Sequence, residues 1–147
     1  MTTRLTPYLT FRGEAREALD HYQSILGGTV EVMTYADMGG MEEMGIPADR
    51  AGWVMHGSLD VSEGVYLMAS DDARPVEEEI HNGQVALAGW DAADQPRMRE
   101  AFDRLAAGGE VYMPFEQAPW GDWFGQLRDK YGVTWMVDVN GGGDDAA

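Results

Sequence analysis

The chain has 147 residues, of which 44% are hydrophobic and 10% aromatic, a balance typical of a single globular domain rather than a disordered segment. It contains no cysteine, which excludes disulfide frameworks, thiolate zinc sites and cysteine nucleophiles. The net charge of -16 disfavours binding to nucleic acid or to anionic membrane surfaces. No segment resembles a signal peptide or a membrane span, so we expect a soluble, cytoplasmic protein. The acidity indicates either a composition bias that favours solubility or adaptation to salt.

The first half of the chain predicts one helix among four strands. Apolar residues of the helix fall on one stripe, and Gly27-Gly28 marks its end. In chain order the elements are a strand over 8–11, a helix over 15–26 and strands over 29–33, 53–61 and 65–69, the last two forming a hairpin. Residues 37–51 are rich in methionine and are interpreted as a long loop, serving surface packing, partner contact or a ligand-facing lid.

The second half repeats this order about 80 residues later along the chain. Asp94 is a candidate N-cap of its helix, and Gly108-Gly109 marks the helix end. The strands are predicted over 85–88, 110–113, 123–128 and 133–139, around a helix with an apolar stripe at Met98, Ala101, Phe102 and Leu105.

Hairpin turns after each helix make neighbouring strands antiparallel, which argues against a doubly wound parallel sheet. The sequence therefore predicts an α+β domain over 1–147 built from two βαβββ modules, at about 5–70 and 83–140. A linker over 71–82 joins them, and a disordered tail is expected over 141–147.

A series of motifs from about Thr6 to Asn140 resembles the PhnB-like proteins of the glyoxalase/bleomycin-resistance/extradiol-dioxygenase superfamily, also called the vicinal oxygen chelate superfamily. The motifs are Pro7–Phe11, Arg16–Ala18, Tyr22–Gly28, Met55–Leu59, Leu67–Asp71, Trp120-Gly121 and Tyr131–Val137. The resemblance implies open, curved mixed sheets around a cavity, helices on the outside, and a homodimer. Such proteins are sometimes labelled demethylubiquinone methyltransferase-like, but the sequence has no glycine-rich nucleotide loop after a strand.

The metal enzymes of this superfamily hold their ion with four inward-facing side chains. Carried across by the resemblance, these positions are Pro7, Met68, Gln84 and Met136, of which only Gln84 offers a metal donor. We therefore expect no metal and no cofactor. The nearby donors, which form no recognisable ligand set, are Tyr8, Thr10, Ser70, Asp71, Thr134 and Asp138.

His56 is the candidate catalytic residue. Strand alternation places it on one face with Val54, Ser58 and Asp60, and leaves an apolar face for the helix. An imidazole there would act as a general base or bind a ligand near neutral pH. The alternative is a buried histidine that is satisfied by a neighbouring group.

Residues 113–125 are rich in aromatic and turn residues, as expected of a small-molecule pocket or, alternatively, of a core or a dimer interface. The predicted ligand-binding residues are Gln84, Trp90, Phe115, Trp120, Trp123, Phe124, Met68 and Met136. The function predicted is small-molecule binding without a metal. One alternative is a lyase, isomerase or dioxygenase-type enzyme with a displaced metal site or with His56 as acid/base. Another is an interaction module that uses the methionine-rich loop.

Overall fold

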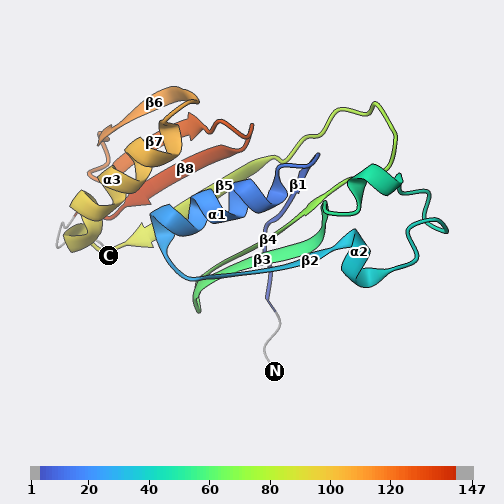
Figure 1. Cartoon of the computed structure of the whole chain (residues 1–147). Coiled ribbons are helices and arrows are strands. Elements are labelled where there is room, and N and C mark those ends of the chain that lie inside the picture. The colour runs from blue at the N-terminus through green and yellow to red at the C-terminus, as the bar shows by residue number, and fades with distance from the viewer. Residues whose placement is uncertain (1–3, 142–147) are drawn as a thin grey trace. The chain divides into compact units, whose positions relative to one another are not determined.

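The computed structural model describes residues 4–141 of the chain, which divides into two compact units, Met1–Asn82 (unit 1) and Gly83–Ala147 (unit 2). Each unit contains a four-stranded mixed sheet, called sheet 1 and sheet 2 here (Figure 1). The tail predicted over 141–147 lies, apart from Gly141, outside the described residues.

Unit 1 has its strands in the order β1-β4-β3-β2, with β1 parallel to β4 and the other pairs antiparallel. Its elements are β1 (Tyr8–Phe11), α1 (Ala15–Leu26), β2 (Thr29–Thr34), α2 (Tyr35–Met38), η1 (Ala48–Arg50), β3 (Val54–Ser62) and β4 (Val65–Asp71). The segment predicted as a loop over 37–51 thus begins inside a helical turn. Thr34 and Asp37 explain this difference, because they form a reciprocal capping box that starts α2.

Unit 2 repeats the arrangement, with the order β5-β8-β7-β6 and β5 parallel to β8. Its elements are β5 (Gln84–Trp90), η2 (Ala92–Asp94), α3 (Gln95–Ala106), β6 (Glu110–Gln117), β7 (Trp123–Arg128) and β8 (Thr134–Val139). The predicted α+β fold with two βαβββ modules is therefore confirmed.

Two details of unit 2 differ from the sequence prediction. β6 runs to Gln117, past Pro114, because an edge strand with irregular pairing tolerates a residue that has no N–H group. Asp94 precedes α3 but makes no side-chain cap. Its carboxylate instead accepts hydrogen bonds from the backbone N–H of Asp91 and from Arg97.

The predicted helix stripes form the core of each unit. α1 buries Ala15, Ala18, Leu19 and Tyr22, and α3 buries Met98, Ala101, Phe102 and Leu105. Each helix lies across one face of its own sheet because a glycine in the middle strand leaves room for it. An added Cβ at Gly57 on β3 would lie 2.7 Å from Leu19 Cδ1 of α1, and one at Gly125 on β7 would lie 2.7 Å from Phe102 Cε2 of α3. In both modules, therefore, a glycine in an inner strand makes room for a side chain of the helix.

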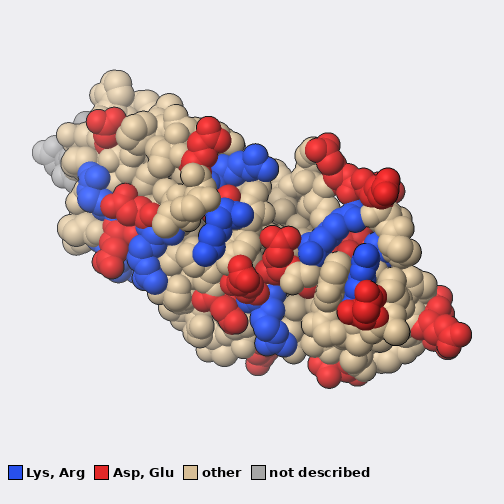
Figure 2. Space-filling model, turned by 45° about the horizontal axis from the view of Figure 1, so that its top comes forward, with Lys and Arg blue, Asp and Glu red and all other residues tan. Residues whose placement is uncertain are grey.

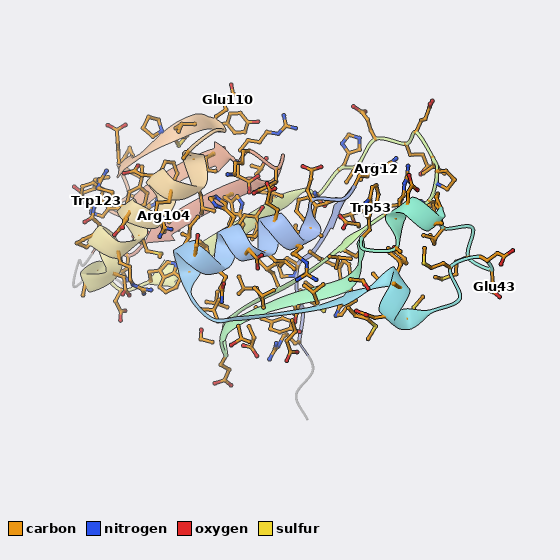
Figure 3. All side chains as sticks on the ribbon, in the orientation of Figure 1. Arg12, Glu43, Trp53, Arg104, Glu110 and Trp123 are labelled. Carbon is orange, nitrogen blue, oxygen red and sulfur yellow. The ribbon has the colours of Figure 1, made fainter. Side chains whose placement is uncertain are left out.

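The predicted linker packs against unit 1. Arg12 donates to the carbonyl oxygens of Val76 and Glu78, and Arg50 donates to that of Ala73 at 3.0 Å. Asn82 pairs with both backbone groups of Thr10, accepting from its N–H at 2.7 Å and donating to its C=O at 3.0 Å. In Figure 3, Arg12 lies at the end of unit 1 where this segment passes.

Buried Asp71 connects three parts of unit 1. Its Oδ1 accepts from the backbone N–H groups of Gly13 and Ala15, at the start of α1, and its Oδ2 accepts from that of Val54 at 2.9 Å. A buried carboxylate needs such partners. Asp71 is therefore a structural residue.

Acidic and basic side chains are interspersed on the surface seen in Figure 2, and the basic ones form no separate patch there. Between residues 4 and 141 no helix combines the length and the apolar character needed to cross a membrane.

Candidate functional site

Each sheet has one face that carries its helix and one that faces away from it, called the open face here. On the open face of sheet 1 the side chains are polar, aromatic or thioether groups, because the aliphatic residues of the strands alternate toward α1. These side chains are Tyr8, Thr10, Thr29, Glu31, Met33, His56, Ser58, Asp60, Tyr66, Met68 and Ser70.

His56 lies on this open face, together with Ser58, as the alternation predicts. Val54 does not share the face. The pairing of β2 with β3 shifts between Met33 and Thr34, so Met55 is an extra residue and Val54 turns toward the helix. Val54 is accordingly 1% exposed, and its Cγ1 would lie 3.4 Å from a Cβ added at Gly57.

A hydrogen bond joins His56 to Tyr8 across the open face. Tyr8 Oη lies 3.0 Å from His56 Nδ1, and the two rings are 5.7 Å apart between centroids. The residues stand on β1 and β3, with β4 between them. Sequence reasoning named both residues separately but not as a pair, since 48 positions separate them and no local spacing connects them.

The open face of sheet 2 has a similar mixture of side chains. Phe124 pairs with Asp138, and Gln126 pairs with Met136. Trp120, from the turn before β7, stands edge-on to Phe124 with 5.8 Å between ring centroids and is 64% exposed. Predicted ligand-binding residues that reach this face are Gln84, Trp120, Phe124 and Met136, whereas Met68 is on the open face of sheet 1.

The other predicted aromatic residues lie on the α3 side of sheet 2, so the predicted aromatic residues are divided between the two faces of this sheet. Phe115 is 4% exposed and stacks on Phe102 of α3 at 5.6 Å. Trp123 shares its face with buried Gly125, and the Arg99 guanidinium lies 5.3 Å from its ring centre. Strand alternation explains the split, because Trp123 and Phe124 are adjacent and point to opposite faces.

Trp90 also packs toward α3. The guanidinium of Arg97 lies 4.9 Å above its ring, and its indole Nε1 is buried without a partner among the described residues.

Two carboxyl groups meet at the edge of the sheet 2 open face. Burial first, and then a hydrogen bond and like charge from Asp122, raise the pKa of Asp138 above its usual range. The Oδ1 atom of Asp138 is buried and has no partner in the described part of the chain. Asp122 also accepts from the backbone N–H of Gly141 at 3.2 Å. No local motif predicts this pair, because it forms only when β8 lies beside β7.

Side chains suited to a divalent metal do not gather in the described part of the chain. Within residues 4–141, no group of three or more His, Asp or Glu side chains converges to hold an ion. Pro7 precedes β1 and, by strand alternation, belongs to the same side of the sheet as buried Leu9. Tyr8 is therefore the residue on the open face at the start of β1. A phenol, two thioethers and an amide do not fit a hard divalent cation.

Comparison with known proteins gives the family. The 3-demethylubiquinone-9 3-methyltransferase family matches residues 3–138. Protein YjdN of Escherichia coli is 29% identical, over 92% of this chain and 94% of its own. The crystal structure of protein PA1353 from Pseudomonas aeruginosa is 35% identical with a TM-score of 0.76, covering 95% of this chain and 98% of that one.

More distant structures share the fold. A Bacillus cereus protein described as a putative 3-demethylubiquinone-9 3-methyltransferase, PhnB protein, has a TM-score of 0.67 at 24% identity and covers 93% of this chain and 99% of its own. Structures described as glyoxalase/bleomycin resistance protein/dioxygenase members share the fold as well. The chain therefore belongs to the 3-demethylubiquinone-9 3-methyltransferase family, and it shares its fold with structures described as glyoxalase/bleomycin resistance protein/dioxygenase members.

Proposed function

We propose that this protein binds small planar organic molecules on the open face of each sheet and does so without a metal centre. One observation carries the proposal. The open faces present partly exposed aromatic and thioether side chains next to a few polar groups, while no set of metal-binding side chains converges in the described residues. Apolar walls with sparse polar groups are the usual composition of small-molecule sites.

Sheet 2 supplies the aromatic contact surface. Trp120 and Phe124 hold an edge-to-face arrangement, and Met136 lies on the same face. An aromatic ligand gains both from stacking and from contact with a polarizable sulfur. Gln84 and Gln126, also on this face, add amide donors and acceptors that are suited to orienting such a ligand.

Methyl transfer, which the family description names, has little support in this chain. A dinucleotide- or adenosine-binding site of the common kind needs a glycine-rich turn between a strand and a helix. The turn from β1 to α1 holds one glycine, Gly13, and the turn from β5 to α3 holds none. We therefore place binding ahead of methyl transfer.

The test is titration with 2-naphthol, a planar aromatic probe, followed by calorimetry and tryptophan fluorescence. We expect saturable binding that weakens about three- to tenfold in Trp120→Ala or Phe124→Ala, from the lost aromatic contact. Tyr112→Ala is the matched control, since Tyr112 is a 49% exposed aromatic residue at an irregularity of edge strand β6. Equal weakening in the control, or no saturable binding by the unaltered protein, would refute the proposal.

A further inference from the structure

The Tyr8–His56 pair leaves one imidazole nitrogen for another molecule. Tyr8 Oη occupies His56 Nδ1 at 3.0 Å, and in the part of the chain that the structure describes His56 has no other hydrogen-bond partner. The pair is not buried, since Tyr8 is 46% exposed. His56 Nε2 is therefore a polar group held in a fixed direction and left without a hydrogen-bond partner among residues 4–141.

The chemistry of the pair defines what it recognises. In a neutral imidazole one nitrogen donates and the other accepts, so Nε2 takes the role opposite to the one that Nδ1 takes toward Tyr8. The phenol hydroxyl both donates and accepts. Together the two groups complement an oxygen that takes or gives one hydrogen bond, such as a carbonyl or a hydroxyl.

The surroundings favour a neutral, planar ligand. Met33 pairs with His56 across β2 and β3, and Met68 pairs with Tyr8 across β1 and β4, so a thioether adjoins each member of the pair. Thioethers contact aromatic rings favourably. Glu31, also on the open face, pairs with Ser58 two positions along β3 from His56, and its negative charge disfavours a carboxylate or phosphate at the same place.

We propose that Tyr8 and His56 form the polar anchor of a ligand site on the open face of sheet 1, which takes the hydroxyl or carbonyl oxygen of a neutral planar molecule. His56 contacts the ligand oxygen, and Tyr8 is a positioning residue that fixes the imidazole. The inference rests on the proposed small-molecule binding for the existence of a ligand, and it adds the kind of polar group that the ligand carries.

The experiment compares two probes with the same ring system, 2-naphthol and 2-methylnaphthalene, which differ by a hydroxyl in place of a methyl group. Calorimetry on the full chain should show about three- to tenfold tighter binding of 2-naphthol, the gain from one hydrogen bond. In His56→Leu this preference should vanish, while the affinity for 2-methylnaphthalene stays within about twofold. Tyr66→Phe is the matched control, because it removes another phenol hydroxyl from the same open face, one that does not hydrogen-bond His56, and should keep the preference.

Nitrogen NMR of the histidine rings supplies a second readout that needs no variant. Adding 2-naphthol should shift the ring signals of His56 and leave those of His21 and His81 in place. Tyr8→Phe should change the His56 tautomer signal in the free protein and reduce the preference for 2-naphthol, which a purely structural role of Tyr8 would not do.

The two proposals fail in different ways. Equal affinity for both probes, or a preference that survives in His56→Leu, would overturn the anchor and leave small-molecule binding intact. A His56 ring that does not respond to 2-naphthol would also overturn the anchor. Binding of neither probe would overturn the proposed function together with the anchor.

Discussion

The glycines beneath the two helices predict different responses to the same substitution. Gly125→Ala places a methyl group 2.8 Å from Phe115 Cα, a backbone atom, and 2.7 Å from Phe102 Cε2. Gly57→Ala places one 2.7 Å from Leu19 Cδ1, the flexible end of a side chain, with its other neighbours at 3.4 Å. Only the second clash can be relieved by rotating a side chain.

The expected losses in unfolding free energy follow from these contacts. At Gly125 the backbone must move by roughly 0.6 Å to restore an ordinary contact, which is the kind of overpacking that costs about 2–3 kcal/mol. At Gly57 the shift of the Leu19 side chain should cost only about 1 kcal/mol. Alanine also restricts the unfolded chain more than glycine does, which returns about 0.5–1 kcal/mol of stability. We therefore expect Gly57→Ala to be close to neutral and Gly125→Ala to be clearly destabilising.

Urea denaturation followed by circular dichroism and by tryptophan fluorescence measures both changes. Trp53 belongs to unit 1 and the other four tryptophans belong to unit 2, so fluorescence reports mainly on the unit that contains Gly125. The fluorescence midpoint should fall in Gly125→Ala and hardly move in Gly57→Ala. Equal losses in both variants, or a larger loss in Gly57→Ala, would refute the reasoning from flexible and rigid neighbours.

Three further predictions concern charge, metal and assembly. The pKa of Asp138 is raised in the folded protein, so its protonated form contributes stability at low pH that is lost as the pH rises through the folded pKa. Asp138→Asn should therefore raise the melting temperature at pH 7 and leave it unchanged well below pH 4; an equal gain at both pH values would contradict this. The purified protein should carry well under one equivalent of zinc, nickel, iron or manganese by elemental analysis, and a chelator should not change its melting temperature. We expect a homodimer in sedimentation at micromolar concentration, as the resemblance to the PhnB-like proteins implies; a monomer there would count against it.

The sequence predicted the helices and the module repeat well, because both signals are local. Apolar residues spaced for one helix face, with a glycine at the end, identified α1 and α3 almost to the residue. Gly27 and Gly108 have φ values of 81° and 79°, a conformation that favours glycine and stops a helix. Strand ends were less predictable, and the irregular edge strand β6 is the clearest case.

The candidate site was only partly predictable, because the pairing of the strands decides on which face of the sheet a side chain lies. A single extra residue at Met55 moved Val54 to the opposite face from His56, and nothing in the local sequence marks that shift. The aromatic residues of 113–125 were found by composition, yet alternation divided them between a core face and an open face. The pairs Tyr8–His56 and Asp122–Asp138 exist only through long-range strand contacts.

The side chain of Asn82 bears on how this protein keeps itself from aggregating. β1 is an edge strand, and such strands expose N–H and C=O groups that can template the addition of a strand from another molecule. Asn82 pairs with both backbone groups of Thr10, near the middle of the four-residue β1, as a neighbouring strand would. The last residue of unit 1 thus interrupts the exposed row of backbone groups and protects this edge of sheet 1 against further growth.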